Sequence, residues 1–144
     1  LLIAGKHDDE NYLSFIQKKS KELGVQDNVH LLGRVSENEK SWYFNNCSAF
    51  AFPSISEGFG LPVVEAMSCG KPLFLSDRTA LPEIGGDVSF YFHDFNAEHV
   101  QKVFHDGMEL YNANGLRKKI KDRSYNFNWH KAAREYLDVY RSLY

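Results

Sequence analysis

A glycine-rich loop between a predicted strand and a predicted helix is the segment best suited to chemistry. It runs from Pro53 to Pro62 and contains Gly58 and Gly60. Glycine lacks a side chain, so the backbone there can turn sharply or approach a ligand closely. The helix that starts at Leu61 and Pro62 has first-turn N–H groups without internal partners, and these can bind a phosphate. Taken alone, the glycines are more typical of a plain turn that caps a helix.

Two glutamates favour the binding hypothesis. Glu57 precedes the glycines, and Glu65 lies eight positions later, on the first turn or so of the predicted helix. Because helical side chains lean toward the N-terminus, Glu65 can point back at whatever the loop holds. One interpretation of Glu65 is a solvated helix residue, and the other is an acceptor for two ribose hydroxyls. Glu57, beside a phosphate site, is suited to accept hydrogen bonds from sugar hydroxyls.

The elements around this loop predict an α/β fold. Short apolar runs predict strands, and apolar residues at helical spacing predict helices. Because the two alternate, we expect a Rossmann-like parallel sheet with helices on both faces, followed by C-terminal helices. In such sheets ligands bind at the carboxyl ends of the strands, where the loop begins. The predicted strands are 1–4, 29–32, 48–52, 73–76 and 88–92. The predicted helices are 10–23, a helix that begins at the capping box 36–39, 62–69, a helix that contains 100–111, and 129–144.

Composition excludes several classes of protein. A chain of 144 residues with 43% apolar and 25% charged residues fits one globular domain. The net charge of −2 provides no basic excess for nucleic acid. No apolar run approaches the roughly 20 residues that span a bilayer. Cys47 and Cys69 lack metal-ligand spacing, so we expect buried, reduced thiols of a cytoplasmic protein.

Other catalytic patterns are weak. No two of the six histidines have the i, i+4 spacing that, together with a carboxylate, is typical of zinc sites. His7, followed by three acidic residues, is interpreted as part of a solvated loop and helix start. Ser56 is not in a G-x-S-x-G elbow, and no P-loop sequence occurs. Glu83 is expected in a loop as a structural cap. The basic stretch 117–123 is interpreted as a solvated face, with contact to anionic lipid as the alternative.

The loop and its surroundings resemble a known family. Glu57 to Met67, followed by Cys69-Gly70-Lys71-Pro72, is similar to the E-x7-E signature of the group-1 family of retaining GT-B glycosyltransferases. The resemblance extends over nearly the whole chain. Its further segments, in order, are Leu2–Gly5, Asn28–Val35, Pro53-Ser54, Leu81–Ile84, Gly86-Asp87 and Trp129–Ala133.

The resemblance implies a fold and a set of residue roles. The fold is the C-terminal half of a GT-B enzyme. Glu57 is implied to be the catalytic carboxylate that meets the donor-sugar hydroxyls. The remaining roles are contact with the sugar and diphosphate for Gly58, Phe59, Gly60 and Leu61, ribose binding for Glu65, and flanking of the nucleobase for Gly33, Arg34 and Val35.

The resemblance also implies the reaction. A UDP- or GDP-sugar would donate a hexose, with retention, to a glycan or lipid-linked acceptor in polysaccharide biosynthesis. The nucleotide sugar is then a substrate, and neither a cofactor nor a metal is expected. In the family an Arg and a Lys neutralise the leaving diphosphate, and they lie upstream of the strand that opens this chain. The implied location is the cytoplasm, with a peripheral contact at the inner face of the membrane left open.

The organisation expected from these features is a single nucleotide-sugar-binding domain over residues 1–144. Because the chain opens on a buried strand at Leu1–Gly5, we expect a fragment that lacks its first strand and an N-terminal acceptor domain, and that is inactive alone. Two alternatives remain. One is a domain of a GT-B enzyme that uses sugar phosphates. The other is a non-catalytic flavodoxin-like or receiver module, although a receiver needs an Asp where this third strand ends in Pro53-Ser54.

Overall fold

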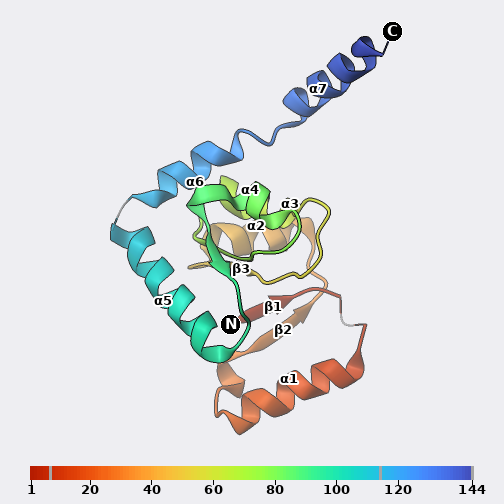
Figure 1. Ribbon diagram of the computed structural model, residues 1–144. Coiled ribbons are helices and arrows are strands. Elements are labelled where there is room, and N and C mark those ends of the chain that lie inside the picture. The colour runs from red at the N-terminus through yellow and green to blue at the C-terminus, as the bar shows by residue number, and fades with distance from the viewer. Residues whose placement is uncertain (7, 114, 144) are drawn as a thin grey trace. The chain divides into compact units, whose positions relative to one another are not determined.

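Short parallel strands alternate with helices as far as residue 113, and two further helices follow (Figure 1). The structure, a computed structural model, describes residues 1–6, 8–113 and 115–143. The strands are β1 (Leu2–Ala4), β2 (His30–Gly33), β3 (Phe50–Phe52), β4 (Leu73–Ser76) and β5 (Phe90–Phe92). The helices are α1 (Glu10–Glu22), α2 (Glu37–Asn46), α3 (Leu61–Ser68), α4 (Leu81–Gly85), α5 (Ala97–Ala113), α6 (Leu116–Ser124) and α7 (Trp129–Ser142), with 3-10 turns at Gln26–Asn28 and Gly86–Val88.

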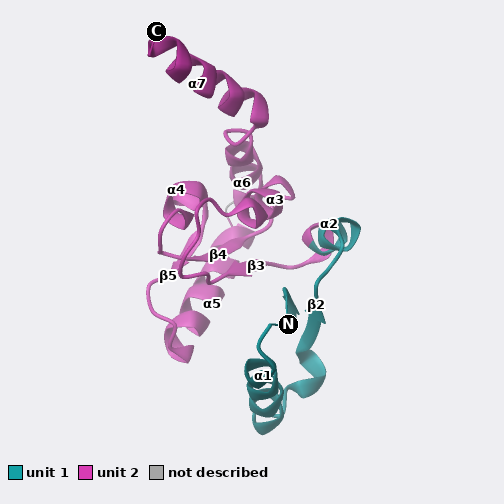
Figure 2. Cartoon of the chain, turned by 90° about the vertical axis from the view of Figure 1, so that its right-hand side faces the viewer, with its two compact units in different colours: residues 1–43 teal, residues 44–144 magenta. Residues whose placement is uncertain are grey.

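The chain forms two compact units, residues 1–43 and 44–144 (Figure 2). Each unit has its own parallel sheet: β1–β2 in the first, and β3–β4–β5 in that order in the second. The predicted α/β class and the parallel pairing are confirmed. The division into two sheets differs from the single sheet expected, because alternation predicts parallel strands without specifying which strands are neighbours.

The first unit is built from β1, α1 and β2. Leu2 pairs with His30 and Ile3 with Leu31, and the register then shifts so that Ala4 pairs with Gly33. Asp9 caps α1, because its side chain accepts hydrogen bonds from the N–H groups of the second and third helical residues at 2.9 and 3.1 Å. The predicted capping box then begins α2.

That capping box is formed as expected. The Glu39 carboxylate accepts from the Ser36 N–H at 2.7 Å, and the Ser36 hydroxyl accepts from the Glu39 N–H at 3.3 Å. Each bond satisfies a donor that the helix start would otherwise leave unpaired. Sequence therefore located this helix start correctly.

The core of the second unit surrounds β4, whose four residues are all buried. The apolar face of α3 lies against it through Val63, Ala66 and Met67, each fully buried. On α5, a Cβ at Gly107 would come within 2.6 Å of the Phe74 ring, so glycine allows that helix to approach the strand closely. Burial of each large apolar side chain here contributes about 1.5–3 kcal/mol.

Two helical regions depart from expectation. Glu83 was predicted in a loop, but it lies in α4 and is exposed. This helix has only five residues and carries a proline in its first turn. Five residues are too few to show helical periodicity. The predicted helix over 129–144 is present as α7, yet its apolar side chains are largely exposed: Trp129 is 79% exposed and Tyr136 is 67% exposed. Periodicity reveals an apolar face but not its partner; Tyr144, the last residue of the predicted helix, lies outside the described residues.

The described helices include none that is both long and apolar enough to cross a membrane.

Candidate functional site

The turn into α3 has the geometry that the glycines predicted. Gly60 is the N-cap of α3 with a φ of +99°, a conformation that side-chain-bearing residues rarely adopt. It is buried, and a Cβ there would lie 3.0 Å from Leu81 Cδ2. Gly58 differs, because no described atom outside its two chain neighbours lies within 4 Å of where its Cβ would be. Gly60 therefore shapes the turn, while Gly58 leaves an exposed stretch of backbone open to a ligand.

The helix start offers fewer donors than the sequence suggested. Pro62 has no N–H, and the Val63 N–H donates to the Gly60 carbonyl at 2.9 Å. The backbone thus folds back on itself at the first turn, which uses a group that we expected to be available. Donors for an anion must therefore come mainly from the N–H groups of the loop before the helix and of Leu61.

The loop itself is fastened to the carboxyl end of β4 and to the residues after it. The buried Ser76 hydroxyl donates to the Ser54 carbonyl, and the Glu57 N–H donates to the Thr79 hydroxyl at 3.0 Å. Glu57 is half-buried, whereas its neighbour Gly58 is exposed. Both bonds fix the backbone immediately before the glycines.

A third contact holds the middle of the loop. The Phe59 ring meets the Phe127 ring edge-on, with centroids 5.9 Å apart. The Arg123 guanidinium lies 5.8 Å from the Phe127 centroid and also donates to the carbonyls of Glu83 and Ile84 at the end of α4, at 2.6 and 2.8 Å. Arg123, predicted as part of a solvated basic face, therefore joins two helices beneath the loop.

Glu65 is the fifth of the eight residues in α3, so it lies in the second turn rather than the first. Its side chain is half-buried, and its Oε2 atom is shielded from solvent. A fully solvated carboxylate, the simpler of the two interpretations, does not describe this position. On the core side of the same helix, Val63, Ala66 and Met67 are fully buried, and Val64 is partly buried.

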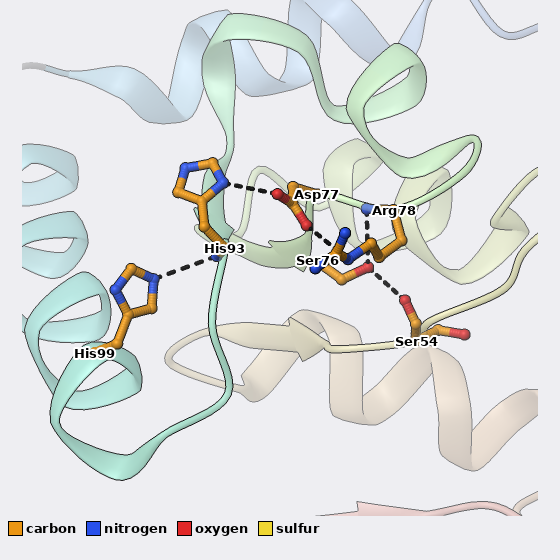
Figure 3. Close-up of polar contacts among 6 residues, drawn as sticks. All are labelled: Ser54, Ser76, Asp77, Arg78, His93 and His99. Carbon is orange, nitrogen blue, oxygen red and sulfur yellow. Dashed lines mark hydrogen bonds and ion pairs between the residues drawn. The ribbon is translucent and has the colours of Figure 1, made fainter.

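A polar cluster that sequence analysis missed lies where β3, β4 and β5 end (Figure 3). Asp77, directly after β4, accepts from His93 Nδ1 at 2.9 Å and pairs with Arg78 Nε at 3.1 Å. The backbone N–H of His93 donates a hydrogen bond to His99 Nε2 at 3.2 Å. The hydrogen bond from His93 lowers the pKa of Asp77, and the charge of Arg78 acts in the same direction. The sequence did contain one signal for this cluster: Asp77 and His93 each directly follow a predicted strand. Residues that follow parallel strands meet at one edge of the sheet.

The predicted nucleobase turn belongs to the first unit. Gly33 ends β2 with a φ of +69° and accepts a hydrogen bond from the Gly5 N–H at 2.9 Å. Arg34 is exposed and Val35 is half-buried. The turn therefore lies at the carboxyl end of its strand, as expected. Its role beside a nucleobase stays a prediction.

The remaining candidate residues have structural surroundings. Cys47 and Cys69 are free thiols and only half-buried, less than predicted. Burial raises the pKa of Cys47, against the opposing charge of Lys71. That lysine donates to the Asn45 and Cys47 carbonyls at 2.9 and 2.8 Å. Across residues 1–6, 8–113 and 115–143, no three His, Cys, Asp or Glu side chains gather closely enough to hold a metal; His7 lies outside the described residues.

Comparison with known proteins identifies the family. The model of the family described as glycosyl transferases group 1 matches residues 1–133. The chain belongs to the glycosyl transferase group 1 family. Among curated relatives of the chain, O-antigen chain mannosyltransferase B of Escherichia coli is 31% identical over 121 residues, which cover 80% of the chain and 30% of the relative.

Solved structures agree on the fold. A sucrose-phosphate synthase from Thermosynechococcus elongatus matches 99% of the chain with a TM-score of 0.76 and 26% identity. HepE from Anabaena, in complex with UDP-glucose, matches 98% with a TM-score of 0.81 and 18% identity. The chain covers 38% and 40% of those two proteins, respectively. The architecture of the chain is that of the C-terminal half of a GT-B enzyme.

Proposed function

We propose that this chain binds the nucleoside diphosphate sugar for a retaining glycosyltransferase, and that the whole protein transfers a hexose to a glycan or lipid-linked acceptor. The observation that carries the proposal is the loop before α3. It presents a half-buried Glu57, an open backbone at Gly58 and a tight turn at Gly60, followed by the shielded carboxylate of Glu65. Carboxylates flanking exposed loop backbone suit a ligand that is rich in hydroxyls and also carries phosphates.

The roles of the two carboxylates follow from their surroundings. Two negative charges beside a diphosphate are unfavourable unless each is offset by strong hydrogen bonds. Sugar hydroxyls provide such bonds, because an ionised carboxylate accepts without donating and its charge shortens and strengthens each bond. We assign Glu57 to the hydroxyls of the transferred sugar, as the catalytic carboxylate, and Glu65 to those of the ribose.

The rest of the site would be filled by the diphosphate and the base. Loop N–H groups from Gly58 to Leu61 are assigned to the diphosphate or sugar, and Gly33, Arg34 and Val35 to the nucleobase. No cofactor or metal forms part of the proposal; the cations that neutralise the leaving group would come from the rest of the whole protein. A fixed set of such charges, already oriented before reaction, is the usual source of stabilisation for a leaving diphosphate.

The choice of hexose rests on the relatives. The Escherichia coli relative is named an O-antigen chain mannosyltransferase, which makes mannose the first candidate and polysaccharide biosynthesis the first process to consider. UDP and GDP are both retained as nucleotides. A cytoplasmic location, with a peripheral contact at the membrane, belongs to the same proposal for the whole protein.

A second candidate follows from the sucrose-phosphate synthase likeness. In that case the whole protein would use a sugar phosphate as acceptor while the donor loop kept its role. Assays of the whole protein with glycan and with sugar-phosphate acceptors separate the two, because only one class should give a product.

The test of donor binding is a calorimetric titration of the chain with GDP, GDP-mannose, UDP and UDP-glucose. We expect weak binding of one nucleotide and its sugar, and a loss of about tenfold in affinity for the nucleotide sugar in Glu57→Gln. Glu98→Gln, at an exposed first-turn glutamate of α5, is the matched control and should change nothing. Equal affinities in the parent chain and both variants would contradict the assignment of Glu57.

A further inference from the structure

Thr79 occupies an unusual backbone conformation beside the proposed donor loop. Its φ is +50°, and among the described residues it is the sole non-glycine residue with a positive φ. It is also the only threonine in the sequence. A β-branched residue is poorly suited to this left-handed region, which glycine and asparagine adopt far more readily. Backbone geometry alone therefore does not favour threonine here.

The Thr79 hydroxyl makes a contact that a glycine would not. It accepts the hydrogen bond from the Glu57 N–H at 3.0 Å, across 22 residues of sequence. Thr79 is exposed, so water could satisfy the same N–H if the hydroxyl were absent. The Glu57 N–H therefore does not need the Thr79 hydroxyl as its acceptor. What the hydrogen bond adds is a fixed position for the Glu57 backbone.

The backbone around Thr79 is firmly held. On one side, β4 ends in the buried Ser76, whose hydroxyl accepts from the Arg78 N–H at 3.4 Å. On the other, α4 begins with the fully buried Leu81, whose N–H donates to the Arg78 carbonyl at 3.2 Å. Thr79 thus projects from a segment anchored at both ends in the core.

The same segment touches the loop twice. Ser76 reaches the Ser54 carbonyl, and Thr79 reaches the Glu57 N–H. The two contacts lie on either side of Ser56, which leaves little freedom for the chain between them. The direction in which the Glu57 side chain leaves the backbone is therefore set by the core through Thr79.

We infer that Thr79 is a positioning residue that holds Glu57 in place for the sugar of the nucleotide-sugar donor. The inference rests on the proposed function, because it gives Thr79 no contact with the donor itself. Its consequence is selective. Loss of the hydroxyl should weaken binding of the sugar portion, which Glu57 is assigned to meet, while the nucleoside diphosphate portion binds as before.

Three substitutions separate the hydroxyl from the backbone. Thr79→Ser keeps the hydroxyl, Thr79→Ala removes it and keeps a side chain at positive φ, and Thr79→Gly removes it and relieves the unfavourable φ. Affinities for GDP-mannose and GDP, and for UDP-glucose and UDP, are measured by calorimetry on each variant and on Glu57→Gln. The ratio of affinities for the nucleotide sugar and its nucleotide isolates the contribution of the sugar.

We expect Thr79→Ser to keep that ratio, and Thr79→Gly to lower it about three- to tenfold without loss of thermal midpoint. Thr79→Ala should lower the ratio as well, with little change in the thermal midpoint, because alanine is no more strained at this φ than threonine. In the free chain, the Glu57 amide proton should exchange with solvent faster in Thr79→Gly than in the parent chain or Thr79→Ser.

Each other outcome overturns a stated part. If the parent chain binds and Glu57→Gln loses the sugar contribution while Thr79→Gly retains it, the role of Thr79 is wrong and the proposed function stands. An unchanged exchange rate of the Glu57 amide proton in Thr79→Gly would show that the hydrogen bond does not form. If the parent chain binds none of the four compounds, the proposed function fails, and the role of Thr79, which rests on it, fails as well.

Discussion

At the scale of single residues, the two signature glutamates differ in how their backbone is held. Glu57 is in a loop and depends on a hydrogen bond from its own N–H to Thr79. Glu65 is inside α3, with its core-side neighbours fully buried and one carboxylate oxygen shielded from solvent. The side chain as a whole is half-buried, so its carboxylate is less hydrated than an exposed one and a ligand hydroxyl would displace less water there.

Glu65→Gln tests whether that carboxylate binds ribose. We expect affinity for the nucleoside diphosphate to fall at least about tenfold, because charge-assisted bonds are each worth about 1.5–3 kcal/mol. The thermal midpoint of the free chain should barely move. Calorimetry with the parent ligand and with its 2′,3′-dideoxy form completes the measurement.

The dideoxy ligand should bind the parent chain more weakly, yet it should weaken Glu65→Gln scarcely further. Such non-additivity is required when two changes remove the same contact. Additive losses would instead mean that Glu65 acts indirectly, through the start of the helix.

Asp77→Asn tests the cluster at the strand ends. The hydrogen bond from His93 and the charge of Arg78 lower the pKa of Asp77 below its ordinary value of 3.8 in the folded protein. The folded state therefore favours the ionised carboxylate, and the resulting stability is present above the unfolded pKa, near 4. It is lost as the pH falls through the lowered folded-state pKa.

We therefore expect the thermal midpoints of the parent chain and Asp77→Asn to differ at neutral pH and to converge in acid, below about pH 4. Asp138→Asn, at an exposed aspartate of α7, serves as the control, with little difference at any pH. A gap for Asp77→Asn that persisted unchanged into strong acid would rule out the carboxylate as its source.

At the scale of elements, the two loop glycines have different tasks. Gly60→Ala forces a side chain into a φ of +99° and against Leu81, so we expect a loss of about 1–3 kcal/mol in the free energy of unfolding. Gly58→Ala meets no described atom within 4 Å, so stability should be nearly unchanged while affinity for the nucleotide sugar falls. Denaturant titration and calorimetry give the two quantities; equal stability losses in both variants would contradict this division.

The sequence identified these elements where the local chemistry is strong. The helical spacing of apolar residues in α1, the capping box of α2 and the apolar run of β4 located their elements closely. It failed where the outcome depends on contacts between distant residues. α4 is too short for periodicity, and the Asp77–His93 bond joins groups 16 residues apart.

The same limit explains the site. The order of glutamates and glycines marked the loop, because each residue type carries its own chemistry. Thr79 and Phe127, which hold that loop, lie far away in sequence and are ordinary residue types there. Nothing in local pattern reveals such partners, since only the folded chain brings them to Glu57 and Phe59.

At the scale of the whole molecule, the chain spans only part of the curated relatives it matches: 30% of the Escherichia coli mannosyltransferase and 38% of a Methanocaldococcus jannaschii glycosyltransferase. The acceptor and the cations for the leaving diphosphate are therefore proposals about a longer protein. Donor binding is the part of the account that the chain can test directly.

We expect the chain alone neither to transfer nor to hydrolyse GDP-mannose or UDP-glucose above background. Without added cations and a closed cleft, the leaving diphosphate is poorly stabilised and water is not excluded. Release of nucleoside diphosphate, followed by chromatography, is the measurement. Turnover that occurs with the parent chain and is abolished in Glu57→Gln would overturn this expectation. A contaminating hydrolase could not produce that difference, because it would be unaffected by the substitution.

The most direct measurement of donor binding follows the backbone amide signals of the chain during titration with GDP and with UDP. The account predicts that one nucleotide shifts the signals of Glu57–Glu65 together with those of Gly33–Ser36, and that Glu65→Gln weakens the response. Shifts confined to other places, such as the hollow lined by Gln17, Lys21 and His30, would contradict it.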